Sequence, residues 1–422
     1  MSTLLLAVGL GYALAVAISL WPPRRFGTAA LVGWFVGWLI GELPLHQLAV
    51  LASLTIVGVA GGGLDAPAGW VGVGLAAAAA LGLLRHVRLA GHAPAAVERA
   101  LDGDLAGHGG APALAPPPRW RRALDVALVV PLRPRRVARI RDLVYHRVGK
   151  RALRLDVYRR RDLPADAAAP VFVYVHGGAW VIGNKGQQGR LTVHRLAAAG
   201  WVCVSINYRL SPRATFPDHI HDVKRALRWV REHVAAHGGD PRFVVIGGGS
   251  AGAHLASLAA LTPNALEYQR DFPEVDTTVQ GCVGYYGVYD FADRDRHHRH
   301  GAFRRLLLER VVMKRRFDDA PEEFDKASPR WRIAGAAAPP PFMLLHGDRD
   351  SLAPAPAARD FRDHLRRASS APVVWVELPG AQHAFEIFPS LRSDVAVRGV
   401  ERFCHAIHAA WRAAAPGVDA TR

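Results

Sequence analysis

The chain has 422 residues, half of them hydrophobic, and a formal net charge of +17, which is enough length for one large catalytic domain and a further region. The basic residues are scattered, without interleaved aromatic residues or a recognisable module, so a nucleic-acid-binding protein is not expected. The three cysteines have no Cys-x-x-Cys spacing, which argues against a disulfide framework and a structural zinc site.

The first 90 residues are apolar and carry only four arginines and two acidic side chains. Residues 3–21 contain no charge, can cross a bilayer, and lack the basic start and cleavage site of a removable signal peptide. Further apolar runs occupy residues 28–41, 45–64 and 69–84. Because these runs have no polar face, residues 1–90 are predicted to be a bundle of three or four transmembrane helices rather than a buried soluble core.

Basic pairs follow the first and last apolar runs, at Arg24 and Arg25 and at Arg85 and Arg88. The positive-inside rule assigns both pairs to the cytoplasm if an even number of crossings separates them. Three spans satisfy this condition when residues 28–64 cross once, whereas four spans leave one pair outside. The second pair is followed by further arginines in the chain, which strengthens its assignment to the cytoplasm. We therefore expect a multi-pass membrane protein with a cytoplasmic catalytic domain.

Residues 91–136 are predicted to be a linker followed by a basic juxtamembrane segment. Residues 91–118 are rich in Ala, Gly and Pro, and residues 119–141 contain eight arginines around an apolar stretch. That composition is typical of a segment at the surface of an anionic membrane, and a solvated basic surface explains it equally well. Membrane lipids are therefore an expected partner, and nucleic acid is not.

Strand-like and helical patterns alternate over residues 137–415, the predicted catalytic domain. The apolar strand-like runs are residues 154–158, 171–175, 201–206, 243–246, 279–285, 342–345 and 373–378. Helical patterns occupy residues 219–234, 251–261 and 393–411. This alternation predicts the α/β class, with a mostly parallel sheet covered by helices on both faces. The charged and aromatic stretch 262–335 has the character of a lid-like insert.

Two glycine-bearing motifs follow strand-like runs. HGGAW occupies residues 176–180 after the run 171–175, and GGSAG occupies residues 248–252 after the run 243–246. The second motif has the G-x-S-x-G pattern that holds a serine on a sharp strand-to-helix turn. A serine hydroxyl becomes a strong nucleophile only beside a base. Ser250 is therefore predicted to be a nucleophile, in preference to a simple helix N-cap.

The HGGAW motif predicts the matching oxyanion hole. Paired glycines allow main-chain N–H groups to approach a developing negative charge. We expect the N–H groups of Gly178 and Ala179, with that of Ala251 after the serine, to form the hole. His176 is expected to fix the loop rather than to act as a base.

The acid and the base are expected after later strands. Asp348 and Asp350 both follow the run 342–345, and His383 follows the run 373–378. Asp350 is preferred as the acid because it lies further into the loop, with Asp348 as the alternative. The order Ser250, Asp350, His383 is nucleophile, acid, base. In this arrangement the aspartate fixes the histidine tautomer and stabilises the imidazolium.

These motifs resemble the α/β-hydrolase superfamily, in particular the hormone-sensitive-lipase-like carboxylesterases, over residues 137–412. The resemblance also includes NYRLSP at 207–212, HGDRD at 346–350 and GAQHAF at 380–385, and it makes the last aspartate of HGDRD the catalytic one. The layout, with apolar helices before the hydrolase, is similar to the membrane-anchored Lip-type esterases of actinobacteria. It implies a lipase or carboxylesterase acting on a small-molecule or lipid ester, without metal or organic cofactor.

Two departures from the family pattern leave the subfamily open. Gly249 stands where members often have Asp, and Ala179 stands where a third glycine is common. Acyl-carbohydrate esterases and arylformamidases therefore remain alternatives. An acyltransferase would use the same acyl-enzyme, and a non-catalytic binding module could use the same fold.

Two further groups of residues have weaker functional interpretations. The run HHRH at 297–300 favours a loop over a metal site, because contiguous histidines converge poorly on one ion. Tyr285, Tyr286 and Tyr289 are candidates for an acyl pocket and equally for ordinary core.

Overall fold

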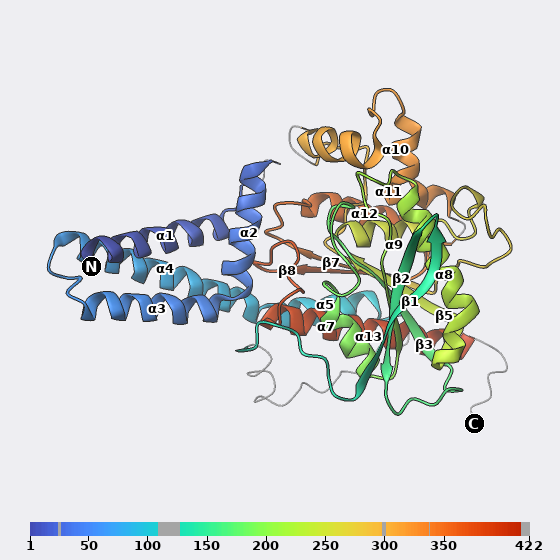
Figure 1. Cartoon of the computed structure of the whole chain (residues 1–422), viewed down its shortest axis with the longest axis horizontal. Coiled ribbons are helices and arrows are strands. Elements are labelled where there is room, and N and C mark those ends of the chain that lie inside the picture. Colours follow the sequence, from blue (N-terminus) through green and yellow to red (C-terminus); the bar gives the residue numbers. More distant parts are fainter. Residues whose placement is uncertain (24–26, 109–126, 298–300, 337, 415–422) are drawn as a thin grey trace.

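A computed structural model describes residues 1–23, 27–108, 127–297, 301–336 and 338–414. Figure 1 shows a helical N-terminal region that projects from one side of an α/β domain. The basic segment around residues 119–126 and the histidines 298 and 300 lie outside the described residues.

The α/β domain is built on an eight-stranded sheet of order β1-β2-β4-β3-β5-β6-β7-β8. The strands are β1 (Val137–Val148), β2 (Arg151–Arg160), β3 (Ala169–Val175), β4 (Val202–Ile206), β5 (Gly239–Gly249), β6 (Gly281–Tyr285), β7 (Phe342–Gly347) and β8 (Val373–Leu378). Strand β2 pairs antiparallel with β1 and β4, and every pair from β4 to β8 is parallel. The mostly parallel sheet is therefore confirmed.

Both faces of the sheet are buried, and β3 shows why its sequence is continuously apolar. Val171, Val173 and Val175 pack in one core cluster, whereas Phe172 and Tyr174 pack in the other. Alternate residues of a strand point to opposite faces, so a strand covered on both sides must be apolar at every position. The helices that cover the two faces are α8 (Asp218–His233), α9 (Ala251–Leu261) and α12 (Ala355–Ala368) on the first, and α7 (Arg190–Ala198), α5 (Ala93–Asp104) and α13 (Leu391–Ala414) on the second.

Helix α5 corrects the expectation of a linker at residues 93–104, whereas residues 109–118 of the predicted linker lie outside the described residues. Val97 and Leu101 of this helix are each 1% exposed and pack in the core beside α13. Asp104 at its end accepts a hydrogen bond from the Trp375 main-chain N–H. The alanine-rich composition of this segment also favours a helix, and the spacing of four residues places both apolar side chains on one face.

The N-terminal region consists of α1 (Ser2–Leu20), α2 (Thr28–Glu42), α3 (Pro44–Ala60) and α4 (Pro67–Gly91). Helices α1, α3 and α4 pack side by side, and α2 stands across their end, next to the α/β domain (Figure 1). Helices α2 and α3 meet at an angle of 88°.

The sequence predicts three or four transmembrane helices, and the described residues contain two or three candidate membrane spans. Two helices are long and apolar enough to cross a membrane, or three if the bent pair of α2 and α3 counts as one. The number depends on this sharp bend, because the short apolar run in α2 turns away from the direction of α3.

The predicted insert over residues 262–335 contains strand β6 of the sheet. The remainder includes a π-helix (Arg304–Met313), α10 (Pro321–Ala327) and α11 (Pro329–Arg332). It is tied to the domain where the Phe216 N–H donates to the Val312 carbonyl at 3.0 Å and His254 Nε2 bonds to the Ala327 carbonyl at 2.7 Å. Whether this part moves as a lid stays a prediction.

Candidate active site

Ser250 occupies a strained turn between β5 and α9. Its φ is 54° and its ψ is −119°, a region that residues with a side chain rarely adopt. A Cβ atom would lie 2.4 Å from the Val175 carbonyl oxygen at Gly248 and 2.0 Å from it at Gly252. The turn therefore requires both flanking glycines, because it is pressed against the end of β3.

The HGGAW loop lies directly against this turn. A Cβ atom built on Gly177 would be 3.2 Å from Ser250 Cβ. Gly178, Ala179 and Trp180 have φ values of 116°, 53° and 61°, so three consecutive residues are held in the left-handed region. Such strain persists only where the surrounding structure over-determines the backbone.

The three N–H groups predicted to form the oxyanion hole are available. In the part of the chain that the structure describes, the N–H groups of Gly178 and Ala179 make no hydrogen bond to protein, whereas that of Gly177 donates to Gln188 Oε1. Ala251 begins α9, and the first N–H groups of a helix have no partner within it.

His176 is placed as a support for the loop. Its ring stacks on Tyr208 at 4.4 Å, and the Tyr208 hydroxyl donates to the His176 carbonyl. Burial lowers the pKa of His176 to about 4, so the imidazole is neutral at neutral pH.

His383 and Asp350 are joined by a short hydrogen bond. His383 Nδ1 lies 2.7 Å from Asp350 Oδ2, and the carboxylate is fully buried. Oδ1 accepts the main-chain N–H groups of Leu352 and Ala353. Burial raises the pKa of the Asp350 carboxyl, but the charges and hydrogen bonds of His383 and His346 outweigh burial and hold the pKa below its usual range. Asp350 is therefore ionised at neutral pH.

Asp348, the alternative acid, has a different role. Its Oδ1 accepts the N–H of Gly380 at 2.7 Å, in the turn before His383. The structure places Asp350 against the imidazole and Asp348 on the turn that leads to it.

Sequence reasoning missed His346 as a second donor to Asp350. His346 Nε2 lies 3.3 Å from Asp350 Oδ2 and 2.8 Å from the Ala353 carbonyl oxygen. Both neighbours accept hydrogen bonds, so Nε2 carries a proton. The position of His346 at the end of β7, four residues before Asp350, was the available signal.

A buried tyrosine and glutamate connect the serine turn to the histidine. The ring of Tyr286 lies 4.5 Å from that of His383. Its hydroxyl donates to Glu386, which also accepts from Tyr174, and burial raises the pKa of Glu386. A Cβ atom on Gly249 would lie 2.7 Å from the Tyr286 hydroxyl. Glycine at position 249 therefore leaves the space that Tyr286 fills.

Sequence reasoning missed Glu386, although an acid three residues after the histidine in an apolar stretch was a signal. The other two candidates for an acyl pocket lie in the core. Tyr285 bonds to Thr192 at 2.8 Å, and Tyr289 stacks on Phe361 at 4.2 Å.

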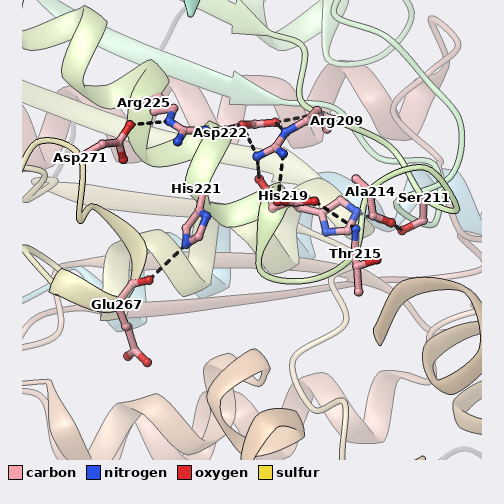
Figure 2. Close-up of polar contacts among 11 residues, drawn as sticks. Arg209, Ser211, Ala214, Thr215, His219, His221, Asp222, Arg225, Glu267 and Asp271 are labelled. Carbon is pink, nitrogen blue, oxygen red and sulfur yellow. Dashed lines mark hydrogen bonds and ion pairs between the residues drawn. The ribbon is translucent and has the colours of Figure 1, made fainter. Parts of the chain in front are cut away.

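The segment that follows β4 contacts the oxyanion loop and stabilises it. Figure 2 shows Arg209 against Asp222, with two guanidinium nitrogens 2.8 and 2.9 Å from the carboxylate oxygens, and His219 against Ser211 at 3.1 Å. The Ser211 N–H donates to the Trp180 carbonyl at 2.8 Å. Burial lowers the pKa of His219 to about 4. This neutral histidine therefore holds the loop without adding charge near the site.

One group of possible metal ligands lies elsewhere. Asp295, His297 and Asp360 place ligand atoms within 4.8 Å of one another. Asp360 already forms an ion pair with Arg330 at 2.7 Å, so the cluster has less negative charge than its composition indicates.

Comparisons with known proteins identify the family of this chain. A family model described as BD-FAE matches residues 155–365. The chain is 43% identical over 397 residues to the "Probable carboxylic ester hydrolase LipM" of Mycobacterium tuberculosis, covering 92% of this chain and 89% of that protein.

Solved structures of an esterase from Thermogutta terrifontis match part of the chain. The butyrate-bound form has a TM-score of 0.50 and 27% identity, covering 58% of this chain and 84% of that one. The form phosphonylated by sarin has a TM-score of 0.51 and 26% identity, covering 60% and 87%. The chain therefore belongs to the α/β-hydrolase esterases of the BD-FAE family.

Proposed function

We propose that this esterase is a membrane-anchored serine carboxylesterase that hydrolyses carboxylic esters, including lipid-derived ones, through an acyl-enzyme on Ser250. The observation that carries the proposal is the 2.7 Å bond between His383 and Asp350, together with the strained turn that holds Ser250. The bond commits Nδ1 of the imidazole to the carboxylate, which leaves Nε2 to exchange a proton with the serine.

The proposed reaction assigns one role to each of these groups. His383 Nε2 takes the proton of Ser250 as Oγ attacks the ester carbonyl, and the carbonyl oxygen becomes an oxyanion. The N–H groups of Gly178, Ala179 and Ala251 stabilise it, each contributing a few kcal/mol. His383 returns the proton to the departing alcohol. Water, deprotonated by His383, then attacks the acyl-enzyme. His383 returns that proton to Ser250 Oγ as the bond between Oγ and the acyl carbon breaks, and the carboxylic acid product leaves and ionises in water.

The membrane anchor is proposed from the surface of α1, α3 and α4. Large apolar side chains project outward from them, among them Leu10, Leu14, Ile56, Val57 and Leu81. Only 28% of each apolar window in the two candidate spans is buried. An exposed apolar surface of this kind is uncommon in proteins surrounded by water. The hydrocarbon core of a bilayer would shield these side chains from water. We place the α/β domain on the cytoplasmic side, following the arginines that end α4.

The decisive experiment is labelling of the full chain with a fluorophosphonate, wild type against Ser250→Ala. The structure of the Thermogutta esterase phosphonylated by sarin supports this choice of reagent. We expect labelling of the wild type alone, and absence of serine-dependent labelling would refute the mechanism. A p-nitrophenyl ester series then measures acyl length, and alcohol acceptors reveal an acyltransferase if transfer exceeds hydrolysis.

Membrane attachment is tested separately by extraction of membranes with alkaline carbonate. An integral protein stays in the pellet, and release of the full chain into the supernatant would contradict the anchor. Protease accessibility of the α/β domain in sealed inverted vesicles tests the cytoplasmic placement.

A further inference from the structure

Helix α2 holds the loop that carries His383. The indole Nε1 of Trp34 donates to the His383 carbonyl at 3.0 Å, and that of Trp38 donates to the Ala384 carbonyl at 2.9 Å. The two tryptophans are four residues apart and therefore lie on one face of the helix. Ala384 has a φ of 66°. The backbone that these indoles bind is therefore strained and persists only where surrounding contacts stabilise it.

Ring packing and a close helix approach strengthen this contact. Trp38 stacks on Phe388 with centroids 4.4 Å apart and on Trp34 at 5.7 Å. A Cβ atom on Gly37 would be 3.2 Å from Gln382 Nε2. The same Gln382 accepts the main-chain N–H groups of Ser351 and His383. Helix α2 thus packs against a side chain that joins the acid loop to the histidine loop.

The C-terminal end of α2 is locked to the turn that precedes His383. Arg392 forms a fully buried ion pair with Glu42 at 3.3 Å. It also donates to the carbonyls of Gly41, His86 and Pro379. One guanidinium therefore connects α2 and α4 to the end of β8. A shift of these helices would also displace the histidine loop.

Three large apolar side chains of α2 stay exposed beside the tryptophan face. Leu31, Val32 and Phe35 are each about half exposed. The helix meets α3 at 88°, so when α3 is inserted in a bilayer α2 lies parallel to the surface. Helices with this orientation bury their apolar face at the boundary between headgroups and acyl chains.

We propose that α2 is a membrane-surface helix that positions the catalytic base, with Trp34 and Trp38 as positioning residues for His383 and a lipid surface as the partner of its exposed face. The inference rests on the proposed serine esterase mechanism. In this proposal the membrane region is part of the active-site scaffold, because α2 binds the main-chain carbonyls of His383 and Ala384.

The test uses the full chain in lipid nanodiscs with Trp34→Phe, Trp38→Phe and the double variant, which keep an aromatic ring and remove the donors. Trp70→Phe is the matched control, because its indole also donates to a main-chain carbonyl, that of Leu64, within the helical region. Displacement of the base by a fraction of an ångström to 1 Å predicts a loss in kcat of about tenfold or more for the double variant. KM should stay near the wild-type value, and fluorophosphonate labelling should slow in parallel.

The melting temperature separates positioning from folding. A double variant with wild-type kcat and labelling rate overturns the positioning role, as does a loss of activity that matches the fraction unfolded. If the wild type itself neither labels nor hydrolyses esters, the proposed function fails, and the inference fails with it.

The lipid contact is tested by attaching an environment-sensitive fluorophore at Leu31→Cys. The three native cysteines are buried, so labelling is selective. Leu266→Cys, an exposed position on the α/β domain, is the control. In phosphatidylcholine nanodiscs we expect blue-shifted emission at position 31 and water-like emission at position 266. Water-like emission at both positions would refute the membrane-surface placement.

Discussion

His383 Nδ1 and Asp350 Oδ2 are 2.7 Å apart, although 33 positions separate the residues in the chain. Asp350→Asn removes the negative charge and favours the wrong histidine tautomer. We expect kcat to fall by about 10⁴-fold, as in other Ser-His-Asp sites, with little change in melting temperature. Steady-state kinetics on a p-nitrophenyl ester measures this.

Asp348→Asn is the matched control for that variant. Its amide oxygen still accepts the N–H of Gly380, so activity should stay close to that of the wild type. Equal losses in the two variants would show that the loop as a whole, rather than the Asp350 charge, supports catalysis.

Gly249 and Tyr286 share one space, which predicts a steric coupling. Gly249→Ala places a methyl group 2.7 Å from the Tyr286 hydroxyl and should cost about 1–3 kcal/mol of stability through overpacking. Tyr286→Phe removes the hydroxyl and should relieve part of this cost in the double variant. A double-mutant cycle by denaturant unfolding gives the coupling energy. Additive effects would show that the backbone moves away instead.

Lys224 predicts a pH dependence of stability. It is fully buried, donates to the carbonyls of Ala259 and Thr262 and to the Thr277 hydroxyl, and burial lowers its pKa to about 7. Unfolded lysines titrate near pH ~10.4, so between these values the unfolded state binds more protons and stability rises with pH.

Lys224→Met removes this contribution. The difference in melting temperature, variant minus wild type, should therefore decrease as the pH is raised from 7 to 9. Thermal denaturation across this range measures it. A difference that does not vary with pH would contradict a lowered pKa for Lys224.

Helix α5 predicts that part of the N-terminal third stabilises the catalytic domain. Leu101 is 1% exposed, and Leu101→Ala should cost about 2–5 kcal/mol, the range for buried leucines. Arg99→Ala, at an exposed position of the same helix, should have an effect within about 0.5 kcal/mol. Denaturant unfolding followed by tryptophan fluorescence compares the two. Equal effects would place α5 outside the cooperative core.

Much of the fold could be predicted because its signals are local. The continuous apolar runs identify buried parallel strands, since a strand covered on both faces must be apolar at each residue. The glycines at 248 and 252 identify the serine turn, because only residues without a side chain fit against the end of β3. The order of Ser250, Asp350 and His383 follows from the motifs that precede each of them.

Other features were decided only by contacts between distant segments. The choice between Asp348 and Asp350 depends on which carboxylate reaches an imidazole from another strand, and both follow the same strand. Helix α5 has the composition of a linker, but it belongs to the core because it packs against β8 and α13. Trp34 and Trp38 belong to an apolar run that is typical of a membrane segment, yet their indoles bind carbonyls about 350 positions away. A sequence pattern reports the character of a local face, whereas the partner of that face is selected by the packing of the whole chain.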